Sequence, residues 1–169
     1  MLLRSSHSGD FVISENIMRK FALFVTAVAA SSAVPAYASG EGRIEARGGI
    51  AFASGASEAF AGAAAGYDFD LGEKAFFGVE GSIDKVLVKG SKALFGVGGR
   101  IGVKAGDKAR LYGTAGYGFA GGGSDPFVGA GVQVGFGAKV YGKVEYRRFI
   151  TSNGLPDINF AGVGVGIRF

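Results

Sequence analysis

The chain has 169 residues, with 32 glycines, one histidine and neither cysteine nor tryptophan. The lack of cysteine excludes disulfide scaffolds, thiol catalysis and cysteine-ligated zinc. The formal net charge is only +4, and the basic residues are scattered along the chain beside acidic ones, which argues against nucleic-acid binding. The glycines lack the three-residue period of collagen and are interleaved with Val, Ile, Phe and Tyr, which favours β-structure over disorder.

The N-terminal region has the three parts of a secretory signal peptide. A basic start at Met18-Arg19-Lys20 precedes an apolar run from Phe21 to Ala30, and Ala36-Tyr37-Ala38 provides a cleavage site after Ala38. A transmembrane helix is the alternative, but the apolar run is well short of the roughly 20 residues that such a helix needs. The sequence therefore predicts export followed by cleavage.

These signals divide the chain into two regions. Residues 1–38 are predicted to form an N-terminal extension and signal peptide, and residues 39–169 one mature domain, long enough to fold alone. Residues 1–17 fit no region of a signal peptide. Either translation begins at Met18 or these residues are an upstream extension.

From Gly42 onward the sequence alternates in steps of two, and no stretch has helical periodicity. In the last segment, for example, valines 163 and 165 fall on one face of a strand and glycines 164 and 166 on the other. Turn residues divide the region into strands at residues 43–52, 59–69, 76–87, 93–105, 109–119, 127–137, 139–150 and 159–169. The predicted fold is all-β: an eight-stranded antiparallel up-and-down transmembrane β-barrel.

The connections between these strands are predicted to alternate in length. Tight turns around Asp70, Asp107 and Ala138 alternate with longer connections at residues 53–58, 88–92, 120–126 and 151–158. Barrels of the outer membrane have an even number of strands, short periplasmic turns and longer outer loops, so both ends of the mature chain are expected on the periplasmic side. Outward-facing aromatic residues then form two girdles, with Phe69, Phe77, Phe136 and Phe169 at the periplasmic rim and Phe52, Phe95, Tyr117 and Phe119 nearer the outer rim.

The second face of each strand, opposite the apolar one, indicates whether the outside of the barrel contacts lipid or water. On alternate strands it carries charged residues, such as Arg43, Glu45 and Arg47, and on the strands between them it is mostly glycine. A soluble exported ligand-binding barrel would place the apolar face inside, but so many alanines and glycines would fill such a core thinly. A face toward lipid needs only to be apolar. The charges are therefore predicted to point into the barrel.

The interior of an eight-stranded barrel is about wide enough for side chains to fill. An isolated charge in that space is costly, so the inward charges are predicted to pair and to leave the lumen largely closed. The predicted lumen charge network consists of Glu45, Arg47, Glu80, Asp84, Arg100, Lys143, Glu145 and Arg147.

No catalytic site is predicted. The histidine, His7, precedes the predicted cleavage site, so the mature chain lacks both histidine and cysteine for general-base or nucleophilic chemistry. Carboxylate pairs at Asp68 and Asp70, or at Glu80 and Asp84, are explained by ion pairing in the lumen. We expect no metal site and no cofactor.

Several cations fall at the predicted outer rim. Lys85 and Arg148 lie on the lipid-facing side near the outer ends of their strands, and Lys89 and Lys92 lie in the second outer loop. They are candidates for binding lipopolysaccharide phosphates. Snorkelling of long side chains to the membrane interface is the simpler explanation of their position.

The alternating strands, the segment KVEYR at residues 143–147 and the ending GVGVGIRF at residues 162–169 carry a family resemblance. The mature chain resembles small outer-membrane barrels of the opacity-protein and outer-membrane-protein-A transmembrane type. The resemblance implies a Gram-negative outer membrane, contact with its lipid and lipopolysaccharide, a monomer, and biogenesis by periplasmic chaperones and the barrel-assembly machinery. It also implies that Phe169, the terminal aromatic residue, belongs to the assembly signal.

These observations predict an integral outer-membrane barrel with a mainly structural or surface role and no enzymatic activity. A narrow porin-like channel, or a barrel that binds lipopolysaccharide or a host surface, is the first alternative. A soluble exported ligand-binding barrel is the second.

Overall fold

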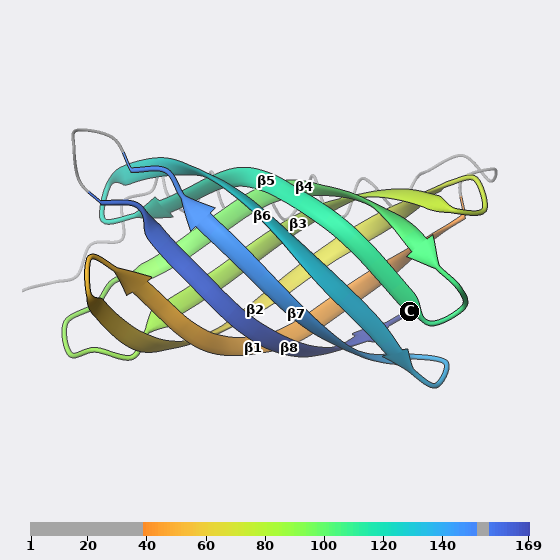
Figure 1. The fold of residues 1–169 in the computed structure, drawn as a ribbon, viewed down its shortest axis with the longest axis horizontal. Coiled ribbons are helices and arrows are strands. Elements are labelled where there is room, and N and C mark those ends of the chain that lie inside the picture. Colours follow the sequence, from red (N-terminus) through yellow and green to blue (C-terminus); the bar gives the residue numbers. More distant parts are fainter. Residues whose placement is uncertain (1–38, 152–155) are drawn as a thin grey trace, which may run out of the picture. The chain divides into compact units, whose positions relative to one another are not determined.

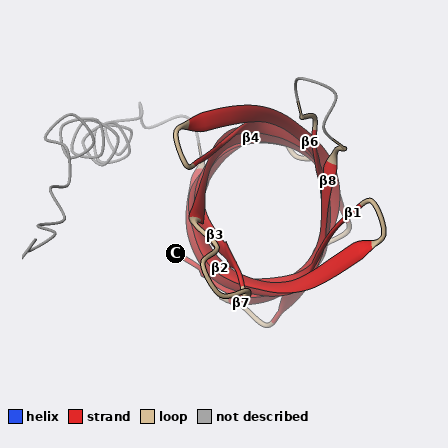
Figure 2. Ribbon diagram, turned by 90° about the vertical axis from the view of Figure 1, so that its left-hand side faces the viewer, coloured by secondary structure: helices blue, strands red, loops and turns tan. Residues whose placement is uncertain are grey.

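The computed structural model describes residues 39–151 and 156–169, so the predicted signal peptide lies outside the described residues. Eight antiparallel strands follow one another around a closed barrel, with the last paired to the first (Figures 1 and 2). The strands are β1 (Gly40–Ala53), β2 (Ala56–Leu71), β3 (Ala75–Val86), β4 (Ala93–Ala105), β5 (Ala109–Ala120), β6 (Gly123–Phe136), β7 (Val140–Phe149) and β8 (Ile158–Arg168). The predicted fold is confirmed. No helix among the described residues has the length and apolar character needed to cross a bilayer.

The two ends of the barrel differ in their connections. The terminal end carries the start of β1, the end of β8 and three short turns at residues 72–74, 106–108 and 137–139. The loop end carries the connections at residues 54–55, 87–92, 121–122 and 150–157. In Figure 1 the C-terminus marks the terminal end.

Two of the connections predicted to be long are instead two-residue hairpin turns. Strand pairing continues to Ala53 opposite Ala56, and to Ala120 opposite Gly123. In both turns the two central residues have positive φ angles, 43° and 84° in the first and 61° and 96° in the second. This is the backbone of a type I′ turn, whose twist matches that of the flanking strands. The predicted alternation of short and long connections is therefore wrong at these two hairpins.

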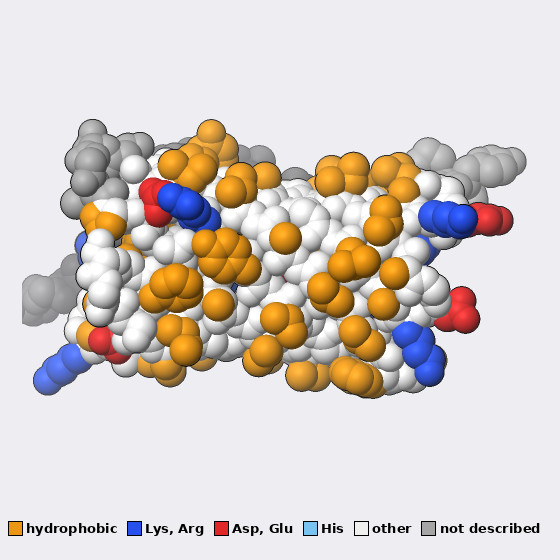
Figure 3. Space-filling view, in the orientation of Figure 1, with side chains coloured by type: hydrophobic (Ala, Val, Ile, Leu, Met, Phe, Trp, Pro, Cys, Tyr) orange, Lys and Arg blue, Asp and Glu red, His pale blue; other side chains and the backbone are white. Residues whose placement is uncertain are grey.

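The outer surface of the barrel is a continuous apolar belt. Its exposed large hydrophobic side chains have relative exposures from 38% to 72%. On the face in Figure 3, charged side chains gather near the two ends, and the middle carries apolar side chains over bare backbone. Phe69 stacks on Phe77 near the terminal end, with ring centroids 6.4 Å apart, and Tyr117 and Phe119 are exposed near the loop end. These positions agree with the predicted aromatic girdles.

Glycine on the inner face makes room for the large polar side chains. A Cβ on Gly166 would lie 2.5 Å from the ring end of Tyr141, and one on Gly66 would lie 2.7 Å from Arg43 Nη2. A Cβ on Gly131 would lie 2.5 Å from the Tyr112 hydroxyl. The inner glycines therefore set the space in which the charged and aromatic side chains can lie.

This packing predicts that Gly166→Ala destabilises the barrel. The new methyl would also lie 2.6 Å from the Ile44 carbonyl, so the backbone has to shift, and we expect a loss of about 1–3 kcal/mol. Gly113→Ala is the matched control, since its nearest atom is 3.8 Å away on the outward face. Urea unfolding in lipid vesicles, followed by far-UV circular dichroism, measures both. Equal stability of the two variants would contradict the packing argument.

Candidate functional site

The lumen holds a dense and electrically neutral set of charged side chains. Among the described residues, ten such side chains are at most 7% exposed. The basic ones are Arg43, Arg47, Arg100, Lys143 and Arg147, and the acidic ones are Glu45, Asp68, Glu80, Asp84 and Glu145. Five positive charges cancel five negative charges. The eight residues of the predicted network all lie in this set, together with Arg43 and Asp68.

Glu80 on β3 is the centre of this lumen charge network. Arg43 Nη1 donates a hydrogen bond of 2.7 Å to Glu80 Oε2, and Arg147 Nη2 donates to Oε1. Arg47 Nη1 and Lys143 Nζ approach the same carboxylate at 3.5 and 4.0 Å. Four cations from β1 and β7 thus share one buried carboxylate, across the full width of the barrel.

Two tyrosine hydroxyls donate hydrogen bonds to Glu45 and Glu145, two further carboxylates of the network. Tyr141 donates a hydrogen bond of 2.8 Å to Glu45, and Tyr112 donates one of 2.7 Å to Glu145. Lys143 Nζ lies 2.5 Å from Glu45 and 3.2 Å from Glu145, so it links the two acids. Each of these two buried carboxylates thus has both an ion-pair partner and a hydrogen-bond donor, which offset the cost of burying its charge.

A second cluster lies closer to the terminal end, around Asp68. Arg100 binds this carboxylate through two nitrogens, and its guanidinium lies 5.3 Å from the ring centroid of Phe76 and 4.8 Å from that of Tyr112. Gln133 accepts a further hydrogen bond of 3.2 Å from Arg100. The hydrogen bonds to Asp68 and the contacts with the two rings compensate the Arg100 guanidinium for the hydration that it loses on burial.

The charges become partly hydrated at the rim of the terminal end. Arg110 lies 2.5 Å from Glu41, and Lys104 lies 2.6 Å from Asp70. These four side chains are between 13% and 29% exposed. Asp68 and Asp70 therefore belong to separate ion pairs. Glu80 and Asp84 instead share a cation, because Arg47 binds Asp84 through Nε and Nη2 and lies 3.5 Å from Glu80 through Nη1.

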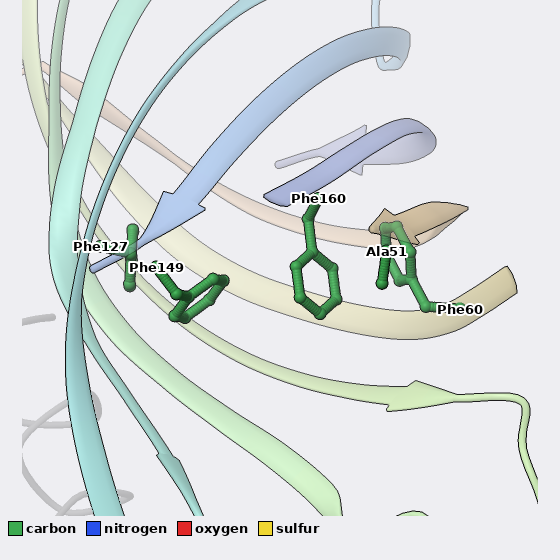
Figure 4. Close-up of a cluster of buried hydrophobic side chains, with 5 residues drawn as sticks. All are labelled: Ala51, Phe60, Phe127, Phe149 and Phe160. Carbon is green, nitrogen blue, oxygen red and sulfur yellow. The ribbon is translucent and has the colours of Figure 1, made fainter. Parts of the chain in front are cut away.

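The loop end of the lumen is filled by aromatic rings instead of charges. Phe60, Phe127, Phe149 and Phe160 form a buried cluster with Ala51, called here the aromatic plug (Figure 4). The sequence-based prediction describes the inner face by its charged residues and glycines and does not include this cluster. Alternation within a strand does place such rings inward, because Phe149 lies two residues from the inward Arg147 on β7, and Phe60 lies eight residues from the inward Asp68 on β2.

A family model of the outer membrane protein beta-barrel domain matches residues 24–169. The chain belongs to this family. A comparison with curated protein sequences gives no match.

Solved structures share the fold of this outer-membrane barrel at low sequence identity. They include Neisserial surface protein A, at 16% identity and a TM-score of 0.56, and the N-terminal β-barrel domain of Pseudomonas aeruginosa OprF, at 17% and 0.59. A third is Ail, the attachment invasion locus protein of Yersinia pestis, solved in complex with the heparin analogue sucrose octasulfate, at 15% and 0.56. Each comparison covers 78% of this chain and 99% of the other.

Family membership and fold place the protein in the outer membrane, so the apolar belt faces lipid and the charged network lies inside. The described residues contain no group of three or more acidic or histidine side chains suited to a metal ion. The lumen of this outer-membrane barrel is a filled interior, with charges in the middle and rings at the loop end.

The predicted outer-rim cations lie on the surface at the loop end. Lys85, Lys89 and Lys92 are exposed. Arg148 donates a hydrogen bond of 2.7 Å to Asp157, which also accepts one from the Thr151 amide. The hydrogen bond from Arg148 holds the pKa of Asp157 below its usual value, so this carboxylate is ionised at neutral pH.

The position of Glu80 predicts that Glu80→Gln strongly destabilises the barrel. The change leaves the four surrounding cations with one negative charge too few in a buried site, and we expect a loss of about 3–5 kcal/mol. Urea unfolding in lipid vesicles measures the loss.

Asp70→Asn is the matched control for this variant. It breaks the ion pair between Lys104 and Asp70, whose side chains are 24% and 29% exposed. Ion pairs that contact water contribute only about 0–1 kcal/mol to the free energy of unfolding. If Glu80→Gln cost no more than Asp70→Asn, the lumen around Glu80 would have to be hydrated.

Proposed function

We propose that this outer-membrane barrel has a structural or surface role and does not act as a channel or an enzyme. The observation that carries the proposal is the filled lumen, in which a neutral charge network and an aromatic plug follow one another along the axis. A porin needs a hydrated path through its barrel, and an enzyme needs a site that its substrate can reach. The mature chain also lacks histidine and cysteine.

The proposal includes an orientation and a maturation step. The terminal end, with its short turns, faces the periplasm, and the loop end faces outward. Cleavage after Ala38 gives a mature chain of residues 39–169, which works as a monomer. Phe169 is 72% exposed and its backbone pairs with Gly42, so its ring is available to periplasmic chaperones and the barrel-assembly machinery during biogenesis.

Conductance in planar bilayers tests the closed lumen. We expect refolded protein to give no steady current, because no ion can cross the network without displacing paired charges. Heat-modifiable mobility on gels provides the folding control, since a closed lipid barrel migrates differently before and after boiling. Large, steady conductance from protein that passes this control would favour the porin-like alternative.

A second candidate function is the binding of lipopolysaccharide phosphates at the loop end. The observation that favours it is Lys85, an exposed cation on the lipid-facing side of β3 that has no ion-pair partner among the described residues. Arg148 already binds Asp157, so Lys85 is the stronger candidate of the two. Snorkelling explains the same positions without a ligand.

Lys85→Ala combined with Arg148→Ala separates binding from snorkelling. If the cations bind phosphate, lipopolysaccharide retention falls about thirtyfold, since each of the two basic residues near an anionic surface contributes about 1 kcal/mol. Lys108→Ala combined with Lys139→Ala, in turns at the terminal end, is the control and leaves retention unchanged. Unchanged retention and unchanged thermal melting in the Lys85 and Arg148 variant would refute specific binding.

A further inference from the structure

The two ends of the lumen differ sharply in their access to water. Acidic and basic side chains at the terminal end, such as Glu41 and Lys104, are about a quarter exposed, at 27% and 24%. At the loop end, the residues of the aromatic plug are all 7% exposed or less. Water therefore reaches the charges from one end of the barrel and stops at rings at the other.

The aromatic plug is continuous across the barrel. The ring centroids of Phe60 and Phe160 lie 4.8 Å apart, those of Phe160 and Phe149 lie 5.3 Å apart, and those of Phe149 and Phe127 lie 5.2 Å apart. The rings come from β2, β8, β7 and β6, and Val86 of β3 and Leu94 of β4 pack against them. Tilted and edge-to-face contacts at these distances are the favourable arrangements of aromatic rings.

Glycines on the inner face of β5 and β8 are placed to accept these rings. A Cβ on Gly118 would lie 2.5 Å from the Phe149 ring, one on Gly116 would lie 2.9 Å from the Phe127 ring, and one on Gly162 would lie 2.9 Å from the Phe60 ring. The bare backbone lets the rings lie against the barrel wall. The plug rings therefore pack against inner glycines, as the large side chains in the charged part of the lumen do.

The plug and the charge network meet with little space between them. Arg147 lies over the Phe127 ring, 5.0 Å from its centroid. The cavity between the two layers has a volume of about 20 Å³ and is lined by Arg47, Asp84 and Lys143 on one side and by Phe60 and Phe149 on the other. A cavity of this volume holds about one water molecule. An ion arriving from the loop end would have to lose its hydration shell among apolar rings before it could reach a charge.

We propose that the aromatic plug is the outer permeability seal of the barrel. The filled lumen then meets water only at the rim of the terminal end, and the charge network behind the plug is closed to solutes from outside. This inference rests on the proposed orientation and deepens the proposed closed lumen, because it assigns the outer closure to the rings and not to the ion pairs.

Thiol labelling tests the seal, because the chain contains no native cysteine. Ser82→Cys places a near-isosteric thiol on the inner face of β3, between Glu80 and Asp84 and behind the plug. In intact cells, a charged methanethiosulfonate reagent added outside should leave this thiol unmodified. Adding Phe149→Ala and Phe160→Ala should raise the labelling rate about tenfold or more, since the apolar barrier is removed.

The control variant adds Phe52→Ala and Phe119→Ala to Ser82→Cys, which removes two aromatic rings from the outward face near the same end. It should leave the thiol unreactive. Rapid outside labelling of Ser82→Cys with the plug intact would overturn the proposal. So would unchanged labelling after removal of the two plug rings in protein that still shows heat-modifiable mobility. If the variant without both rings does not fold, Phe160→Ala alone replaces it. This milder change should raise the labelling rate of the Ser82→Cys thiol by a smaller factor than the double change.

Lys89→Cys, in the exposed connection between β3 and β4, tests the orientation separately. This thiol should react from outside in every background. If it reacts only after the cells are broken, the proposed orientation is wrong. The plug is then judged on broken envelopes, where reagent reaches both ends and the plug variant should still label faster than the control variant.

Discussion

Closure of the hydrogen-bonded ring of strands is the constraint on which the rest of this structure depends. In lipid no water is present to satisfy backbone amides and carbonyls, so a sheet can cross the membrane only if it has no free edge. Here the register of β1 with β8, from Arg43 opposite Arg168 to Phe52 opposite Asn159, joins the two edges. With eight strands the resulting interior is too narrow to remain a water channel, so side chains must fill it.

The filling has to meet two conditions at once, electrical neutrality and volume. Neutrality is met by equal numbers of buried acids and bases, with Glu80 shared among four cations. Volume is met by placing glycine opposite large side chains, as Tyr141 lies against Gly166 and Tyr112 lies against Gly131. The glycine content that marks the sequence is therefore a packing requirement of the lumen and not a sign of flexibility.

Much of this arrangement could be predicted from the sequence, because alternation in steps of two fixes which side chains share a face. It placed the charged residues inside, including all eight of the predicted network. It could not show that Phe127, Phe149 and Phe160 converge, since their depth along the axis depends on strand tilt and register, which one strand alone does not reveal. Alternation also puts Asp68 on the inner face of β2, beside the outward Phe69, but it does not show that this carboxylate binds Arg100 on β4. The two-residue hairpin at residues 54–55 does not follow from the sequence, because it needs a positive φ angle at Ser54, which residues other than glycine seldom adopt.

The central claim is that lipid contacts the valine, isoleucine and phenylalanine face of the barrel. Nitroxide labels at Val132→Cys and Val163→Cys, both on that face and both exposed, test it most directly in reconstituted bilayers. If lipid contacts this face, each label collides readily with dissolved oxygen and rarely with a water-soluble nickel chelate. Frequent collisions with the nickel chelate at both positions would show that water surrounds this face, and would contradict the account.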